Sequence, residues 1–209
     1  MTVVAVLAGG RGSRMGGAKA LAQLWGRPLI AHPLAAASEA GLRAVVVAKS
    51  STPLPPLPEG VELLIEREAL HHPLVGLITA LRAYPRVLAV ACDMPLLNAD
   101  LLGWLAAGPT APLCFTEGER IAPFPSLHVR AELPLLELAV AHAAPLRKTF
   151  RELQDLPASP LTTLPSSLLA RFGEPAQLLR SVNSAAELSD LCTQGRGYMP
   201  GDRPHQPRR

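Results

Sequence analysis

The chain has 209 residues, enough for one α/β domain with a full core and too few for two ordinary domains. Hydrophobic residues make up 48%, which argues against a disordered chain, and aromatic residues only 4%, which argues against a nucleic-acid surface built on stacked rings. The net charge of +3 is carried by the C-terminal segment, where four arginines accompany one aspartate. We therefore expect one domain over residues 1–195 and a disordered basic tail over residues 196–209.

The cysteines Cys92, Cys114 and Cys192 are scattered and form no CxxC pair. Such an odd set is typical of a reducing compartment, and we expect three small buried side chains. The apolar stretch MTVVAVLAGG is too short for the core of a secretory signal and leads into glycines. No apolar run approaches the roughly 18 residues that cross a membrane. We therefore expect a cytoplasmic protein that binds neither membranes nor nucleic acid.

Strands and helical stretches alternate in the first half of the chain. Buried strands are predicted at residues 3–7, 43–48, 61–65 and 86–91. Helices are predicted at residues 28–40, with Pro28 in the first turn and Gly41 as terminator, at 74–84, and at 98–107 with Asn98 as cap. Residues 50–60 contain four prolines and are expected to form a loop. The alternation predicts βαβ units and a mostly parallel sheet.

The pattern is looser in the second half. Residues 111–115 and 123–128 are expected to be extended, and residues 133–142 and 147–156 to be helical. The Pro/Thr-rich stretch 158–165 is predicted to be a loop, and residues 185–192 a final helix capped by Asn183 or Ser184.

A glycine-rich segment, LAGGRGSRMGGAK, follows the first predicted strand and runs from Leu7 to Lys19. Glycines let the backbone turn tightly and bring its N–H groups close to phosphate oxygens, while Arg14 and Lys19 can neutralise phosphate charge. The dinucleotide fingerprint GxGxxG fails because Met15 takes the place of its last glycine, and the P-loop GxxxxGK[ST] fails because Ala20 follows the lysine. The segment therefore predicts a triphosphate-binding loop of another kind.

Asp93 lies just beyond the predicted strand 86–91, and Pro95 turns the chain away. In an open parallel sheet, ligands bind beyond the carboxyl ends of the strands. A carboxylate there can hold Mg²⁺, which prefers oxygen ligands and keeps substrate phosphates in its coordination shell. An aspartate close before a proline is also a common turn or helix cap, so Asp93 alone leaves both interpretations open. Together with the glycine-rich loop, it favours a magnesium–triphosphate site.

Five blocks of the chain resemble the molybdenum cofactor guanylyltransferases, a branch of the MobA-like nucleotidyltransferases. They are LAGGRGSRMGGAK, GRPLI from residue 26, PLVGL from residue 73, ACDMPL from residue 91 and VNSAAEL from residue 182. The first block marks the superfamily, and the combination points to this branch. The resemblance implies an α/β fold of the Rossmann-like nucleotidyltransferase kind, with a single domain, three layers and a mostly parallel sheet.

The resemblance also implies an activity: transfer of GMP from GTP to the phosphate of molybdopterin, with release of pyrophosphate and with Mg²⁺ as cofactor, in the synthesis of molybdopterin guanine dinucleotide. It implies molybdoenzyme maturation proteins as partners. We expect the chain to be a monomer or a small oligomer. The implied catalytic residues are Arg14, Lys19 and Asp93, with Asp93 as the metal ligand. The implied nucleotide-binding residues are Leu7, Ala8, Gly9, Gly10, Gly12, Lys19, Glu66 and Asp93.

The chain departs from the pattern of this family at four positions. Ala18 precedes the loop lysine where the family usually has Asp, and Lys49 stands where an Asn is frequent. Glu66 takes the place of an Asp, and His72 that of the glycine before PLVGL. Because these positions include the region where the family holds the base, use of CTP or of another phosphorylated acceptor stays open. A non-catalytic nucleotide-binding protein is a second alternative, and the failed fingerprint disfavours a dinucleotide-dependent oxidoreductase.

Several side chains carry weaker signals. Ser126 precedes His128 by two positions, but no GxSxG and no matching cysteine–histidine signature supports nucleophilic hydrolysis. His71 and His72 are adjacent, and adjacent side chains rarely point the same way, which favours a loop over a metal pair. Four isolated side chains are assigned to packing or to the surface: Trp25, His32, His128 and His142.

Overall fold

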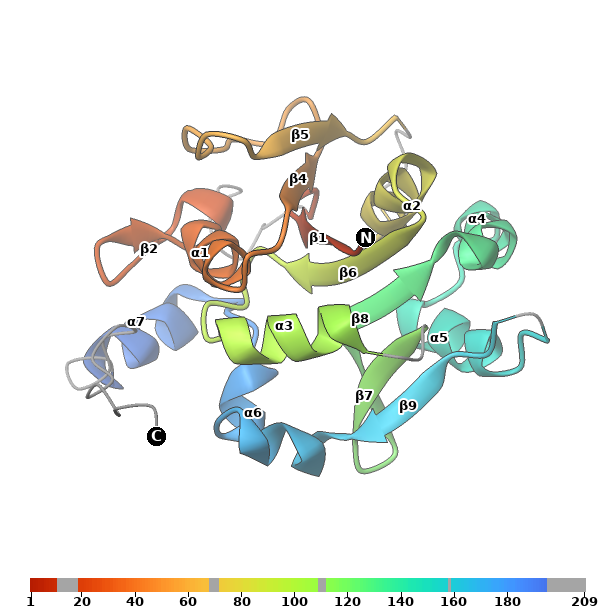
Figure 1. Ribbon diagram of the computed structural model, residues 1–209. Coiled ribbons are helices and arrows are strands. Elements are labelled where there is room, and N and C mark those ends of the chain that lie inside the picture. Colours follow the sequence, from red (N-terminus) through yellow and green to blue (C-terminus); the bar gives the residue numbers. More distant parts are fainter. Residues whose placement is uncertain (11–18, 68–71, 109–111, 158, 195–209) are drawn as a thin grey trace.

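A seven-stranded sheet forms the centre of the computed structural model, which describes residues 1–10, 19–67, 72–108, 112–157 and 159–194 (Figure 1). The strand order is β5-β4-β1-β6-β8-β7-β9, and of these strands only β8 runs antiparallel to its neighbours. The predicted α/β class with a mostly parallel sheet is confirmed. The strands are β1 (Val3–Leu7), β4 (Ala44–Ala48), β5 (Glu62–Ile65), β6 (Arg86–Ala91), β7 (Leu113–Glu117), β8 (Arg120–Val129) and β9 (Thr162–Pro165).

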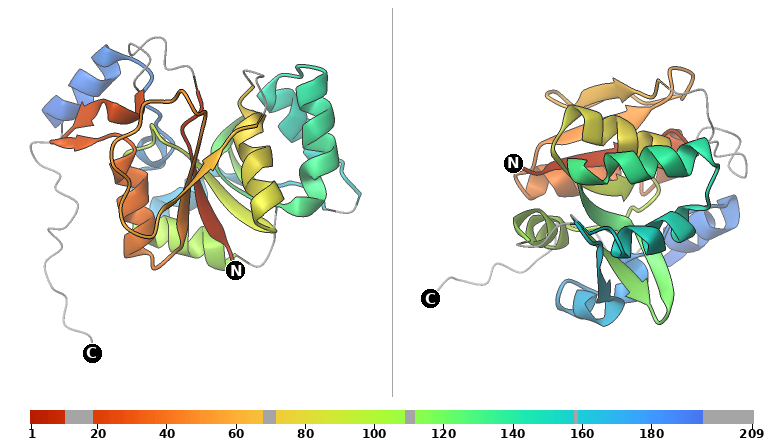
Figure 2. Two further views of the ribbon diagram at one scale, coloured as in Figure 1. Left: turned by 90° about the horizontal axis from the view of Figure 1, so that it is seen from above. Right: turned by 90° about the vertical axis from the view of Figure 1, so that its right-hand side faces the viewer.

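Helices cover both faces of the sheet and complete three layers (Figure 2). None of the helices in the described ranges is long and apolar enough to cross a membrane. One face carries α1 (Ala31–Glu39), α3 (Ala99–Ala107), the 3-10 helix η4 (Ser166–Arg171) and α6 (Pro175–Leu178). The other face carries α2 (Leu74–Ala83), α4 (Leu133–Ala141) and α5 (Leu146–Gln154).

A small third cluster lies at one end of the sheet. There α7 (Ala185–Gln194) packs against a two-stranded ribbon, β2 (Gln23–Leu24) and β3 (Arg27–Pro28). The 3-10 helix η2 (Lys19–Leu21) leads into this ribbon. The ribbon, η4 and α6 were not expected from the sequence.

Strand β1 shows why the sequence of a central strand is apolar throughout. Val4 and Val6 belong to one face's core, and Val3 and Ala5 belong to the other. Because helices cover both faces of the sheet, neither set of alternating side chains faces solvent. Each fully buried valine of this kind stabilises the fold by roughly 1.5–3 kcal/mol relative to exposure.

Three predicted helix ends are confirmed. The side chain of Asn98 accepts a hydrogen bond from the N–H of Leu101 at 3.0 Å and caps α3. Gly41 ends α1 with a φ of 69°, a backbone conformation that glycine adopts without a steric cost. Ser184, rather than Asn183, caps α7, since its Oγ accepts from the N–H of Glu187 at 3.2 Å.

Three predictions are wrong. Pro28 lies in strand β3 and not in a helix, which begins only at Ala31. The stretch predicted as a loop contains β9, which pairs in parallel with β7 and forms one edge of the sheet. Its prolines flank the paired residues or end the strand, where the sheet does not need the backbone N–H that proline lacks. Cys192 is exposed on α7, whereas Cys92 and Cys114 are buried as expected.

The chain reverses direction across the sheet between β1 and β6. From β1 it passes to β4 and β5 on one side, with α1 on one face, and then returns through α2 on the other face to β6 on the opposite side of β1. Such a switch point leaves a crevice outside the carboxyl ends of the two central strands.

Candidate functional site

A cavity of about 450 Å³ opens at this crevice. Its lining comes from the carboxyl ends of four parallel strands and the residues that follow them, together with the first residue of η2, the start of α2 and one residue of β8. The cavity lies over the carboxyl edge of the sheet, where the sequence predicts the site. The lining residues are Leu7, Ala8, Gly9, Gly10, Lys19, Lys49, Glu66, His72, Pro73, Gly76, Ala91, Cys92, Asp93 and Phe124.

Glu66 reaches over the glycine-rich loop at one end of this cavity. A β-carbon at Gly9 would overlap the carboxylate of Glu66, and one at Gly76 would lie 3.2 Å from its Oε1. The carboxylate therefore lies in the space that a β-carbon at Gly9 would take, and close against Gly76 in the first turn of α2. Two glycines that are far apart in the sequence leave room for this one carboxylate at the cavity.

Lys19 and Asp93 form an ion pair at the other end of the cavity. Lys19 begins η2, and Asp93 follows β6, where the backbone N–H of Val182 fixes the turn by donating to the Asp93 carbonyl at 2.9 Å. The Lys19 Nζ also donates to Asn183 Oδ1 at 2.9 Å. The structure thus joins the glycine-rich loop, the end of β6 and the C-terminal block through one ammonium group.

The second carboxylate oxygen of Asp93, Oδ1, is buried and has no hydrogen-bond partner among the described residues. An unpaired buried carboxylate oxygen costs free energy, and a bound divalent cation would remove that cost. No cluster of three or more His, Cys, Asp or Glu side chains is present in the described ranges. Asp93 therefore fits a cation such as Mg²⁺ that takes its other ligands from phosphate oxygens and water.

His72 is held in place by two hydrogen bonds from its ring to backbone groups. Its Nδ1 accepts from the N–H of Leu74 at 3.2 Å, which leaves the proton on Nε2 to donate to the Ala144 carbonyl at 2.7 Å. The ring thereby caps the start of α2 and ties it to the segment after α4. His72 shapes the wall of the cavity, and both of its nitrogens are engaged.

Cys92 lines the cavity beside Asp93 but is not a reactive thiol. Burial, followed by the neighbouring Asp93 charge, raises the pKa of Cys92 to about 12. The thiolate, which is the nucleophilic form, is therefore scarce at neutral pH.

Most of the predicted site residues meet in this cavity. Gly12 and Arg14 lie outside the described residues, as do Ala18, His71 and the predicted tail. Eight lining or contacting residues were not predicted as site residues: Lys49, His72, Pro73, Gly76, Ala91, Cys92, Phe124 and Asn183. Phe124 comes from the antiparallel strand β8, and no local motif marks it; Asn183 was read as a cap, although its block was part of the family resemblance.

The chain is similar to nucleotidyltransferases in sequence. Residues 4–156 match the family model of the MobA-like NTP transferase domain. The molybdenum cofactor guanylyltransferase of Xanthomonas euvesicatoria pv. vesicatoria is 35% identical over 155 residues, which cover 71% of this chain and 78% of that protein. A probable molybdenum cofactor guanylyltransferase of Thermococcus sibiricus is 32% identical over 102 residues, 48% of this chain and about half (52%) of the relative.

Solved structures show the same fold. Molybdopterin-guanine dinucleotide biosynthesis protein A of Archaeoglobus fulgidus superposes with a TM-score of 0.76 at 20% identity, over 95% of this chain and 100% of that one. A 2-C-methyl-D-erythritol 4-phosphate cytidylyltransferase of Thermus thermophilus superposes with a TM-score of 0.63 at 19% identity, over 94% and 98%. Both likenesses concern the fold alone.

Proposed function

The chain belongs to the MobA-like NTP transferase family, and from this premise we propose that it transfers GMP from GTP to the phosphate of molybdopterin and releases pyrophosphate. An oxygen of the acceptor phosphate attacks the α-phosphorus in line with the leaving group. The new P–O bond forms as the bond to the β-phosphate oxygen breaks, and pyrophosphate departs. The protein supplies positioning and charge neutralisation rather than a covalent intermediate.

The single observation that carries the proposal is the ion pair of Lys19 and Asp93 beside the glycine-rich loop, at the switch point of the sheet. It brings a cation and a carboxylate to the place where a triphosphate would lie along the loop. In this assignment Lys19 binds the polyphosphate, and Arg14 is assigned the same role. Gly9, Gly10 and Gly12 let the backbone approach the nucleotide.

We propose Mg²⁺ as the metal. Asp93 would hold it through the unpaired Oδ1, and when bound the ion neutralises charge on the polyphosphate. Lys19 contacts the same carboxylate, which holds its ammonium group at the cavity, where it would neutralise phosphate charge.

Glu66 is assigned to the base. The Watson–Crick edge of guanine offers two adjacent N–H donors, which a carboxylate accepts as a pair. Cytosine presents an acceptor nitrogen next to its single amino donor, so the same carboxylate would oppose that nitrogen. Strands β4 and β1 lie between the strands that carry Glu66 and Asp93, so the two carboxylates enter the same cavity from different strands.

Pyrophosphate release tests the proposal. The chain is incubated with Mg²⁺, molybdopterin and one of GTP, CTP or ATP, and we expect release with GTP. Activity with CTP alone would overturn the guanine assignment and favour the cytidylyl alternative. GTP binding without any release would favour a non-catalytic nucleotide-binding protein. Cytoplasmic location, maturation partners and a monomeric or small oligomeric state stay predictions.

A further inference from the structure

A second cavity lies behind the turn that carries Asp93. It has a volume of about 320 Å³, within the size range of small-molecule sites. Leu96 and Asn98 line it, whereas Cys92 and Asp93 line the first cavity, so the segment 92–98 is a wall shared by both. Asp93 and Leu96 are three residues apart and hence at most about 11 Å apart along the chain.

We propose that this second cavity binds the ring system of the phosphorylated acceptor, a flat heterocycle with amino and keto groups on its edge. The inference rests on the proposed function for the identity of the acceptor. It places the ring of the acceptor beside Trp25 and Glu174 and directs the acceptor's phosphate past Leu96 toward Lys19.

The chemistry of the lining fits such a ring. Trp25, Phe172, Leu96 and Leu191 provide apolar and aromatic surface, which suits the two faces of a flat ring. Glu174 and Gln177 provide acceptors and donors for its edge. A carboxylate accepts the paired N–H donors of an aminopyrimidinone, and this pairing fixes the orientation of the ring.

The charge of the lining fixes which end of the ligand enters. Glu174 is the single charged residue among the described residues that line the cavity. An anionic phosphate would therefore be repelled here, while the neutral ring is accepted. On the other side of the shared wall, Lys19 contacts Asp93 of that wall, so the phosphate points to the Lys19–Asp93 pair.

Trp25 is held in an unusual backbone conformation. The turn between β2 and β3 consists of Trp25 and Gly26, with φ values of 51° and 75°. Such two-residue turns favour Asn-Gly, and a tryptophan at the first position costs roughly 1–2 kcal/mol. The indole packs edge-to-face on His32, with centroids 5.7 Å apart, and its buried N–H has no partner among the described residues. An aromatic side chain fixed in this way at the cavity suits contact with a flat ring.

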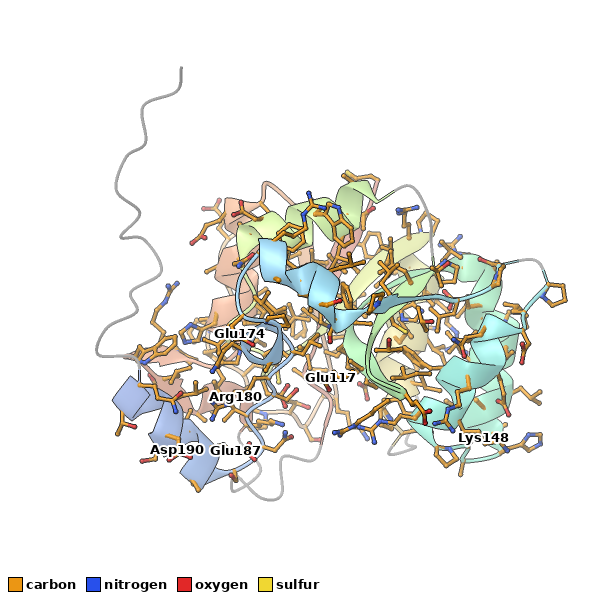
Figure 3. The ribbon with its side chains drawn as sticks, turned by 90° about the horizontal axis from the view of Figure 1, so that it is seen from below. Glu117, Lys148, Glu174, Arg180, Glu187 and Asp190 are labelled. Carbon is orange, nitrogen blue, oxygen red and sulfur yellow. The ribbon has the colours of Figure 1, made fainter. Side chains whose placement is uncertain are left out.

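The C-terminal segment closes the other side of the cavity. Glu174 lines the cavity together with Leu191 and Gln194 of α7, and Figure 3 shows Arg180 between Glu174 and the α7 residues Glu187 and Asp190. Arg180 Nη1 donates to Gln194 Oε1 at 3.4 Å, and Gln194 is part of the cavity wall. Glu174 and Asp190 are both exposed, but only Glu174 lines the cavity, so Asp190 on α7 is a matched control.

Tryptophan fluorescence measures binding directly. The chain has two tryptophans, so Trp104→Phe leaves Trp25 as the single emitter. This variant is titrated with 6-hydroxymethylpterin, a pterin without phosphate. We expect saturable quenching that excess GTP does not reverse. We also expect that Glu174→Gln weakens binding about tenfold and that Asp190→Asn leaves it unchanged. Absent quenching, reversal by GTP, or equal effects of the two substitutions would overturn the inference.

Steady-state kinetics separates this inference from the proposed function. With GTP and molybdopterin as substrates, Glu174→Gln should raise the KM for molybdopterin about tenfold and leave the KM for GTP unchanged. If Glu174→Gln turns over with an unchanged KM for molybdopterin, the inference about the second cavity is overturned and the proposed function stands. Pterin binding that Glu174→Gln weakens, in a chain without turnover, would support the cavity assignment and overturn the proposed function.

Discussion

The carboxylate of Glu66 fills the space above Gly9 in which a side chain would otherwise lie. Glu66 follows β5 at the edge of the sheet, and Gly9 follows β1, with β4 between them. The glycine-rich loop therefore serves two purposes: its backbone is open to phosphate, and its first glycine admits a carboxylate to the same cavity. In the proposed function, Gly9 would couple phosphate binding by the loop to base selection by Glu66.

Gly9→Ala should weaken GTP binding by displacing Glu66. The glutamate side chain is flexible, so the protein is expected to fold and the carboxylate to move aside. We expect the KM for GTP to rise about tenfold, with a smaller change in kcat. The measurement is steady-state pyrophosphate release as a function of GTP concentration.

A double-mutant cycle provides the control for Gly9. In a Glu66→Ala background the methyl group meets no carboxylate, and Gly9→Ala should add little to the loss already caused by Glu66→Ala. Additive effects of the two substitutions would show that the methyl group acts on the phosphate cradle itself and not through Glu66.

Lys19→Met should destabilise the metal-free protein, because it leaves the buried Asp93 carboxylate without its cation. The side chains of Lys19 and Asp93 are 19% and 8% exposed, and breaking such a pair costs about 3 kcal/mol. If Asp93 binds Mg²⁺, millimolar Mg²⁺ should restore part of this loss. We expect the ion to raise the Tm of Lys19→Met more than that of the parent, as measured by thermal unfolding.

Lys19→Met/Asp93→Asn is the matched control, since it removes the carboxylate as well. Its Tm should not respond to Mg²⁺. An equal response in both variants would assign the ion to another place and contradict Asp93 as the metal ligand.

The main site was predictable because its residues follow strands directly. The glycine-rich loop follows β1 and Asp93 follows β6, and parallel strands bring their carboxyl ends to one edge. The second cavity was not predictable in this way. Trp25 and Glu174 meet only because the β2–β3 ribbon, α6 and α7 pack together, and no periodicity in the sequence specifies that packing.

The errors in the predicted elements have a similar origin. Pro28 satisfies the local preference of a helix start, but pairing with Gln23 places it in a ribbon. The Pro/Thr-rich stretch reads as a loop, yet Thr162 and Thr163 pair with β7 at the edge of the sheet. In both cases tertiary contacts override a local preference.

Ser126, His128 and Glu132 form a buried network that the sequence suggested only as an unsupported pair. His128 Nε2 lies 2.8 Å from Ser126 Oγ, and its Nδ1 lies 3.0 Å from Glu132 Oε1. All three side chains are fully buried, and Glu132 also accepts from the N–H of Val129 at 2.7 Å. The arrangement resembles a hydrolytic triad, but no substrate can reach a serine with no exposed surface, so we assign it to stability.

His128→Leu should lower the free energy of unfolding by about 3 kcal/mol, because it leaves the Glu132 carboxylate buried without its partner. Ser126→Ala should cost about 1 kcal/mol and leave pyrophosphate release unchanged. Urea unfolding measures both. His142→Leu, at an exposed position, is the control and should change stability by less than about 0.5 kcal/mol. Loss of turnover on Ser126→Ala without loss of stability would contradict the structural assignment.

The two buried thiols predict a loss of stability in alkali. Burial raises the pKa of Cys92 and of Cys114 to about 12, from an ordinary value of 9.0. Above pH 9.0 the unfolded chain ionises these thiols while the folded chain keeps them protonated, so ionisation favours unfolding. Their stabilising contribution is complete below pH 9.0 and is lost as the pH rises toward 12, by about 1.4 kcal/mol per pH unit for each thiol.

Between pH 8 and 11, the free energy of unfolding measured with urea should therefore fall more steeply for the parent than for Cys92→Ala/Cys114→Ala. The variant begins less stable because it has lost side-chain volume in the core. Other groups that titrate in this range are common to both chains and cancel in the comparison. The exposed Cys192 supplies an internal control, since iodoacetamide should modify it in the folded protein at pH 8 and spare the two buried thiols. Parallel pH profiles of the parent and the variant, or rapid alkylation of Cys92, would show that the thiol beside Asp93 is more accessible than its burial indicates.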